Sequence, residues 1–204
     1  AWTLPDAEQP GEFLRPHSER NLKQHREFLD QVVEGSALHL SIIDWFRTLP
    51  LFLDLPGLRV VHACWHEHSI EQLRPCLDGN NVLHDDAWPL VAPKGAEGFD
   101  ALEVVLKGME APLPDGVWFH DKDGHVRRHT RLRWWWSLRG ETPVTWRDLA
   151  MLPSSEIDKL PHQPVPDDLI PGYHDDKPVF VGHYWMRGAP RRLSEKVGCL
   201  DYSI

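Results

Sequence analysis

Two short apolar stretches decide the fold of this chain: residues 58–65, with the sequence LRVVHACW, and residues 178–184, with the sequence PVFVGHY. Both are rich in β-branched or aromatic residues and are bounded by glycine or proline, a pattern that favours buried β-strands over helices. Each predicted strand ends in a histidine, His62 in the first and His183 in the second. Ligands of an open α/β sheet gather beyond the carboxyl ends of its strands. The pattern therefore predicts that both imidazoles face one metal ion, and zinc, iron and manganese all suit this ligand type.

The composition is that of an ordinary globular protein. The 204 residues suffice for a substantial core, and 41% of them are apolar and 26% charged. No apolar stretch approaches the roughly 18 residues that span a bilayer, so no membrane association is expected. The net charge of −9 argues against nucleic acid as a partner, because nucleic-acid-binding proteins usually carry a basic surface. Cys64, Cys76 and Cys199 form no CxxC pair and are expected to be reduced thiols, which predicts a cytoplasmic location.

The two ends predict that the chain is part of a longer protein. It begins at Ala1 without a methionine, and it stops at Ile204 within a predicted strand. The pattern between the ends predicts an α/β core over about residues 1–65 and 177–204. An insertion over about residues 66–176 interrupts this core.

Helical patterns precede the first strand. Ser18 is the predicted N-cap of a helix that runs to about Glu34, and Ser36 caps a second helix that ends at Pro50. The predicted buried face of the second helix comprises Leu40, Ile43, Phe46 and Leu49. Further elements are expected as a β-hairpin over 51–62 and as helices over 69–77 and 99–107.

A second hairpin is predicted around the turn at residues 121–124, with the sequence DKDG, because Asp-Gly favours the tight turns of hairpins. This turn lacks the acidic positions that a calcium loop needs. On the long return strand the alternating basic residues are Arg127, His129, Arg131 and Arg133. They form either a solvated strand face or a phosphate-binding surface. Residues 151–178, rich in proline and acidic residues, are expected to be a linker back to the sheet.

His66 and His68 follow His62 closely and raise the alternative of a mononuclear zinc site. Two histidines four residues apart share a face only on a helix, whereas His62 ends a predicted strand. His66 is therefore expected on a loop, near a substrate or in solvent.

The order of these motifs resembles that of calcineurin-like metallophosphoesterases. The stretch VVHACW at 60–65 is similar to the family's fourth block, and FVGH at 180–183 resembles its fifth block. The stretch VGCLD at 197–201 is similar to the following strand, which carries an aspartate, and GEFLRPH at 11–17 resembles the segment after the Gly-Asn-His-Glu block. Some branches of the family have a second histidine at the position of Tyr184. In this respect the chain is more similar to the branch of bacterial protein Ser/Thr phosphatases and diadenosine tetraphosphate hydrolases.

The resemblance implies one incomplete metallophosphoesterase domain over residues 1–204, with part of a β-sandwich flanked by helices and a mixed α/β insertion. It implies hydrolysis of phosphate esters at a dinuclear centre, with His62 and His183 as ligands of one of two divalent ions such as manganese, iron or zinc. The family's Asp-x-His, Gly-Asp-x-x-Asp-Arg-Gly and Gly-Asn-His-Glu blocks are missing from this chain. By itself the chain is therefore expected to bind metal weakly and to hydrolyse phosphate esters poorly.

The substrate implied by the resemblance is a phosphoprotein, a nucleotide or a small phosphoester. The candidate substrate-binding residues are His66, Arg127, Arg131 and Arg187. Two other functions stay open: a scaffold that binds partners through an exposed apolar patch at Trp134–Trp136, and a mononuclear zinc hydrolase. The pattern leaves the oligomeric state open.

Overall fold

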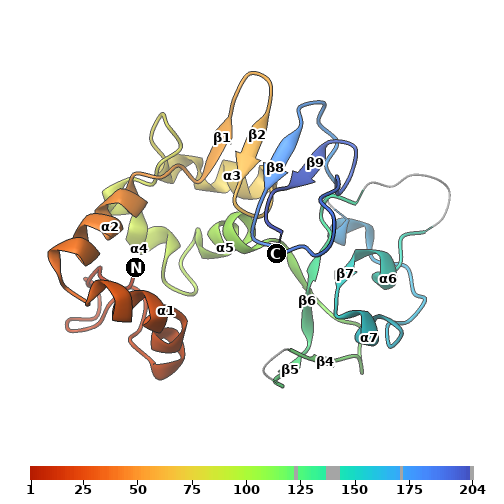
Figure 1. Ribbon diagram of the computed structural model, residues 1–204, viewed down its shortest axis with the longest axis horizontal. Helices are drawn as coiled ribbons and strands as arrows, with labels where there is room; N and C mark the ends of the chain where they lie inside the picture. The colour runs from red at the N-terminus through yellow and green to blue at the C-terminus, as the bar shows by residue number, and fades with distance from the viewer. Residues whose placement is uncertain (122–123, 137–142, 171, 203–204) are drawn as a thin grey trace. The chain divides into compact units, whose positions relative to one another are not determined.

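A computed structural model describes residues 1–121, 124–136, 143–170 and 172–202. The protein is mixed α/β, with several small sheets and helices (Figure 1). The described residues divide into two compact units, and each is considered by itself. Unit 1 comprises residues 1–51 and 68–102, and unit 2 comprises residues 52–67 and 103–204. The core and insertion proposed from the sequence remain a prediction.

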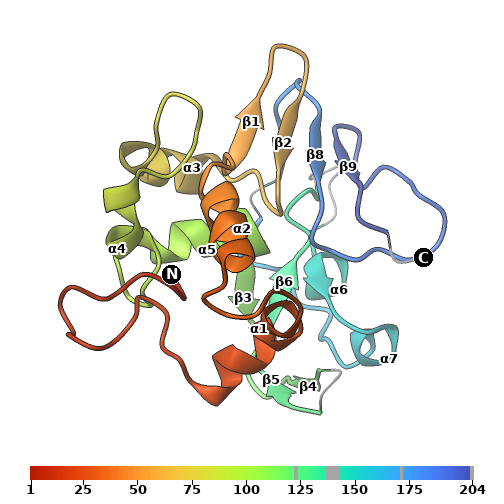
Figure 2. The same cartoon turned by 60° about the vertical axis from the view of Figure 1, so that its left-hand side comes forward.

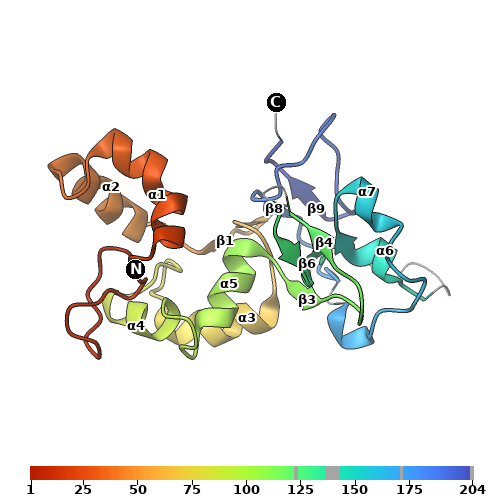
Figure 3. The same ribbon diagram turned by 90° about the horizontal axis from the view of Figure 1, so that it is seen from below.

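Unit 1 is helical, and its first two helices begin where the sequence predicts. The side chain of Ser18 accepts a hydrogen bond from the amide of Asn21, and that of Ser36 accepts one from the amide of His39. Each cap satisfies an amide that has no partner inside its helix. The two helices lie side by side (Figure 3). The helices of the unit are α1 (Glu19–Val32), α2 (Ala37–Arg47), α3 (Glu67–Leu73), η1 (Arg74–Cys76), η2 (Asp85–Ala87), α4 (Trp88–Val91) and the first part of α5 (Phe99–Lys107).

The predicted buried face of α2 is wrong. Leu40 and Phe46 are 50% and 47% exposed, and Leu49 lies beyond the end of the helix. His39 is buried instead, and its Nδ1 accepts a hydrogen bond from the amide of Gly35 at 3.0 Å. Apolar side chains surround this helix on almost every side, so their spacing does not select a face. The ring of His39 lies 5.8 Å from the ring of Phe28 on α1, so it is His39 that faces the neighbouring helix.

Unit 2 contains the sheet predicted from the two apolar stretches. Within the described residues its strand order is β1-β2-β8-β9 (Figure 2). The hairpin of β1 and β2 is confirmed as an antiparallel pair, and β2 pairs with β8 in parallel, with Val60 opposite Phe180. The strand β9 extends the sheet in parallel beyond β8. The strand bounds are β1 (Phe52–Asp54), β2 (Arg59–Val61), β8 (Val179–Val181) and β9 (Val197–Cys199).

The predicted long return strand of the second hairpin is interrupted at Arg128. Its first part, β5, pairs with β4, whereas β6 pairs with β3 on one side and β7 on the other. The predicted turn at 121–124 lies partly outside the described residues, but Gly124 donates its amide to the carbonyl of Asp121 at 2.9 Å. The strands are β3 (Glu110–Pro112), β4 (Phe119–His120), β5 (Val126–Arg127), β6 (His129–Leu132) and β7 (Ala150–Met151).

The segment expected to be a linker is packed instead. Leu160 and Val165 are buried in a cluster with Leu132 and Leu149 beneath the β3-β6-β7 sheet. The prolines and acidic residues of this segment lie among short helical turns that place a few apolar side chains inward. The turns within this segment are α7 (Ser154–Ile157) and η3 (Asp167–Leu169), and α6 (Trp146–Leu149) comes just before it.

The tryptophan triplet contributes to packing more than to the surface. Trp134 and Trp135 are buried, and Trp136 alone of the three is exposed. An exposed patch over all three tryptophans, which the scaffold hypothesis needs, is therefore not present. Across the described residues, no helix is long and apolar enough to span a bilayer.

Candidate metal centre

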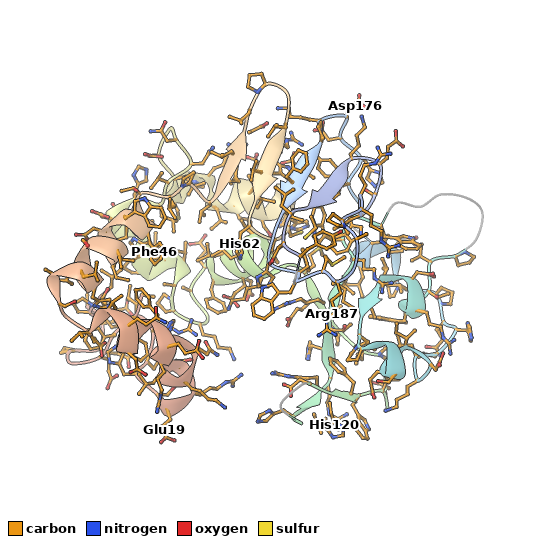
Figure 4. The ribbon with its side chains drawn as sticks, in the orientation of Figure 1. Glu19, Phe46, His62, His120, Asp176 and Arg187 are labelled. Atoms are coloured by element: carbon orange, nitrogen blue, oxygen red, sulfur yellow. The ribbon has the colours of Figure 1, made fainter. Side chains whose placement is uncertain are left out.

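His62 and His183 meet at one edge of the main sheet. Each follows the carboxyl end of its strand, and because β2 and β8 are parallel, these ends lie together. The ring centroids are 5.1 Å apart and the ring planes are inclined by 60° (His62 is labelled in Figure 4). The amide of Gly182 donates to the carbonyl of His62 at 2.9 Å and ties the two strand ends together. The two imidazoles thus lie close together, as the sequence predicts, and their role as ligands of one metal stays a prediction.

The backbone at His183 adopts a conformation that few residues other than glycine adopt. Its φ is +68°, in the left-handed region that costs a non-glycine residue about 1–2 kcal/mol. Its Nε2 is buried and has no hydrogen-bond partner within the described residues. Strained backbone tends to cluster at functional sites, and a buried polar atom without a partner is rare enough to need an explanation. The ring nitrogen is thus available to a ligand from outside the described chain.

Several positive groups surround the pair. Burial, followed by the charges of Arg131, His62 and Lys107, lowers the pKa of His183 to about 4, against an opposing effect of Asp201. Burial also lowers the pKa of His62, again opposed by Asp201. Both rings are consequently neutral at pH 7, and the neutral imidazole is the form that binds metals.

A buried hydrogen-bonded cluster holds the loops that carry the two histidines. The hydroxyl of Tyr184, next to His183, donates to the carbonyl of Ala63, next to His62, at 3.0 Å. The indole nitrogen of Trp134 donates to this same carbonyl at 3.1 Å and to the Tyr184 hydroxyl at 2.8 Å. Trp134 is 1% exposed. The cluster fixes one loop against the other through a shared acceptor.

Gly108 leaves the space that Tyr184 occupies. Its φ is +87°, and a Cβ at this position would lie 2.6 Å from the hydroxyl oxygen of Tyr184. Glycine is therefore required here both for the backbone conformation and for the close approach. Gly182 differs, because a Cβ there would meet its neighbours no closer than 3.7 Å.

Gly108→Ala is expected to destabilise the protein by more than Gly116→Ala does. Gly116 has a similar φ of +80° but open space around it, so alanine there costs only the left-handed strain of about 1–2 kcal/mol. At Gly108 the displaced tyrosine adds about 1–3 kcal/mol, the usual cost of overpacking. Urea unfolding of both variants measures the difference. Equal losses would show that the Tyr184 hydroxyl moves aside without cost.

The pair fits two ligands of a metal ion but not a complete metal site. Among the described residues, no group of three or more histidine, cysteine, aspartate or glutamate side chains is placed to hold an ion. Burial raises the pKa of the thiols of Cys64 and Cys199, so in the metal-free chain both are protonated at pH 7. A metal held here would take its remaining ligands from water or from groups outside the described residues.

The four predicted substrate-binding residues differ in their surroundings. Arg131 acts on His183 through its charge and lines an open groove of about 880 Å³ that also includes Tyr184. Arg127 lines the same groove, where its Nη2 lies 2.7 Å from a carboxylate oxygen of Asp121. His66 is half-buried on the loop after β2 and forms no three-residue metal group with the pair within the described chain. Arg187 is exposed on the segment after His183 (Figure 4).

The predicted basic stripe is shorter than expected. Arg133 turns inward, and its Nη1 donates to the backbone carbonyl of Asp148 at 2.9 Å. Lys107, Gly108 and Trp134 matter to the site, but the sequence predicts none of them there, and it places Trp134 in an exposed patch instead. The glycine directly after a helix is a signal for its backbone conformation, whereas no local pattern indicates the contacts of Trp134.

Comparisons of the chain with known protein families, with curated proteins and with solved structures found no match.

Proposed function

We propose that this chain supplies His62 and His183 as ligands of one metal in the dinuclear centre of a phosphoesterase. The observation that carries the proposal is the convergence of two imidazoles from parallel strands, one of them with a buried Nε2 that has no partner within the described residues. We further propose that the β1-β2-β8-β9 sheet is one layer of a metallophosphoesterase β-sandwich.

The surroundings of the pair suit a phosphate group. Divalent ions such as manganese, iron or zinc, when bound, neutralise phosphate oxygens and lower the pKa of a coordinated water. The chain's own contribution is to orient the two imidazoles and to place Arg131 and Lys107 close enough to affect His183. Arg127 and Arg131 both line the groove, and guanidinium groups bind phosphate through paired N–H donors. A phosphate there would compete with Asp121 for Arg127 and with Glu110 for Arg131. The proposed substrate is a phosphoprotein, a nucleotide or a small phosphoester.

The proposed location is the cytoplasm. Within the described residues Cys64, Cys76 and Cys199 are free thiols. Free thiols are most common in proteins of reducing compartments.

Removal of either histidine is expected to weaken Mn²⁺ binding to the 204-residue chain by at least about tenfold, since loss of a direct ligand should cost no less than the roughly 10–100-fold that loss of an indirect partner costs. Isothermal titration with Mn²⁺ on His62→Ala, His183→Ala and the double variant measures the loss. His120→Ala, an exposed histidine on β4, is the matched control and should bind as the unaltered chain does. The double variant should bind little worse than either single variant, because one ligand alone holds the ion poorly.

Unchanged Mn²⁺ affinity in both single variants would refute the assignment. One tightly bound zinc that survives His183→Ala but is lost in His66→Ala would instead support the mononuclear zinc hydrolase. The chain alone is expected to hydrolyse an aryl phosphate near the buffer rate in Mn²⁺, because two protein ligands leave most coordination positions open. Efficient turnover would contradict the proposal that further ligands lie outside this chain.

A further inference from the structure

Unit 1 contains a cavity of about 260 Å³ that is separate from the histidine pair. About nine water molecules occupy this volume in liquid water. The cavity therefore suits a small molecule rather than a nucleotide. The wall combines aromatic rings with positive groups. The lining residues that matter here are Trp2, Arg15, His25, Phe46, Arg47 and Trp88.

The cavity gathers buried polar atoms that lack a partner. In the described chain, six side-chain nitrogens are buried without a hydrogen bond, and three of them belong to residues that line this cavity. They are Nε of Arg15, Nε2 of His25 and Nε1 of Trp88. The first and third are obligate donors. A buried donor without an acceptor costs about 1–3 kcal/mol, so its retention beside a cavity indicates an acceptor supplied by a ligand.

The charged side chains that line the cavity are all positive. Among the described lining residues there are two arginines and no aspartate or glutamate. Arg15 donates from Nη2 to the side-chain oxygens of Gln24 at 2.6 Å and Asn21 at 3.4 Å, both neutral amides. Its positive charge is therefore not neutralised by these partners. Arg47 contacts Asp85 at 2.5 Å, but that carboxylate is largely exposed to water.

His25 and Ala1 do not supply the positive charge at neutral pH. Burial, followed by the charge of Arg15, lowers the pKa of His25, which favours the neutral ring. Burial, followed by the charges of Arg47 and Arg15, lowers the pKa of the Ala1 amine to about 6. The neutral imidazole can then accept or donate a hydrogen bond, as its ligand requires. Arg15 and Arg47 remain as the fixed charges of the cavity.

We propose that this cavity binds a small organic anion whose carboxylate or phosphate lies between Arg15 and Trp88 and whose apolar part lies against the aromatic wall. The ring of Trp2 is fixed for this purpose by stacking on His17 at 3.8 Å and by a hydrogen bond from its Nε1 to Glu34 at 2.8 Å. This site is independent of the metal centre proposed for unit 2.

The test titrates the 204-residue chain at pH 7.5 with benzoate, phenyl phosphate, inorganic phosphate and benzyl alcohol. The indole N–H signal of Trp88, identified by its absence in Trp88→Phe, is followed by NMR. Benzoate or phenyl phosphate should shift this signal until the site is saturated. The anion that binds with the higher affinity shows whether the site prefers a carboxylate or a phosphate. Benzyl alcohol should not shift it, and inorganic phosphate should bind more weakly than phenyl phosphate.

Calorimetry on variants assigns the site. Arg15→Met should weaken binding of the preferred anion about tenfold to a hundredfold, as expected for loss of a charged hydrogen bond. Trp88→Phe should weaken it less, and Arg20→Met, an exposed arginine on α1, should leave it unchanged. Circular dichroism and thermal unfolding confirm that each variant folds.

Three results would overturn the proposal: no saturable shift of Trp88 with either organic anion, equal binding of benzyl alcohol, or full affinity in both folded Arg15→Met and folded Trp88→Phe.

Discussion

Trp134→Ala is expected to lower the free energy of unfolding of unit 2 by about 3–5 kcal/mol, the usual cost of removing a buried tryptophan. The side chain is almost fully buried and packs edge-on against Trp135 and Tyr173. Its loss leaves a cavity and removes an N–H donor from both Ala63 and Tyr184. Because most domains are stable by only about 5–15 kcal/mol, this loss is a large share of the total stability.

Urea unfolding followed by circular dichroism measures this loss, and two variants separate its causes. Trp134→Phe keeps most of the ring but lacks the N–H, so it should cost less than Trp134→Ala. The carbonyl of Ala63 retains the hydroxyl of Tyr184 as a donor. Trp136→Ala, in the exposed member of the triplet, should cost under about 1 kcal/mol. A Trp134→Ala variant as stable as Trp136→Ala would contradict the packing described here.

Arg59→Met is expected to cost about 2–3 kcal/mol at pH 7, the range for lost hydrogen bonds to charged groups. Arg59 is 8% exposed although it lies on a strand of the main sheet. Its Nη1 lies 2.7 Å from a carboxylate oxygen of Asp175 and 3.1 Å from the hydroxyl of Tyr173. Its guanidinium also lies over the ring of Trp65, 4.4 Å from the centroid. Methionine preserves much of the length and the packing but none of these polar contacts.

This loss should depend on pH. Partial burial acts to raise the pKa of Asp54, but the hydrogen bond from Lys177 and the charge of Arg59 outweigh it, so the pKa lies below its ordinary value. The amide of Lys177, and then the charge of Arg59, lower the pKa of Asp175. Groups with a lowered pKa stabilise the fold above their unfolded pKa of about 3.9 and lose this effect as the pH falls through the folded value. The difference between Arg59→Met and the unaltered chain should therefore shrink from about pH 4 downward.

Arg74→Met is the matched control, because Arg74 and Glu71 form an exposed pair on the surface of unit 1. Exposed pairs contribute about 0–1 kcal/mol, so this variant should unfold nearly as the unaltered chain does. If Arg59→Met were equally mild, or if its cost were the same at pH 7 and pH 3, the contacts of Arg59 would not be a source of stability.

The strands and the histidine pair could be predicted because short stretches of sequence specify them. Each of the two apolar stretches specifies a buried strand by itself, and parallel pairing then brings His62 and His183 to one edge. The helix over 99–107 was predictable for the same reason, since its length and spacing are contained in one segment.

The remaining features depend on contacts that sequence spacing does not encode. The face that α2 buries follows its packing on α1, where His39 meets Phe28, and the break at Arg128 accompanies the pairing of β6 with β3 and β7 rather than with β4. Trp134 reaches the site only through the tertiary arrangement. The packed segment that contains Leu160 has too few apolar residues to distinguish it from a solvated linker.

The hydrogen bond between Tyr184 and Ala63 joins residues that are 121 positions apart in the sequence. Closing so long a loop costs conformational entropy before the contact contributes any stability. Folding rates therefore fall as contacts become less local. The loops around the two histidines therefore come together only when β2 and β8 pair, at the end of a long-range search. If the pair binds a metal as proposed, metal affinity should appear later than helical signal in a refolding experiment, and the ion would then report completed folding rather than initiate it.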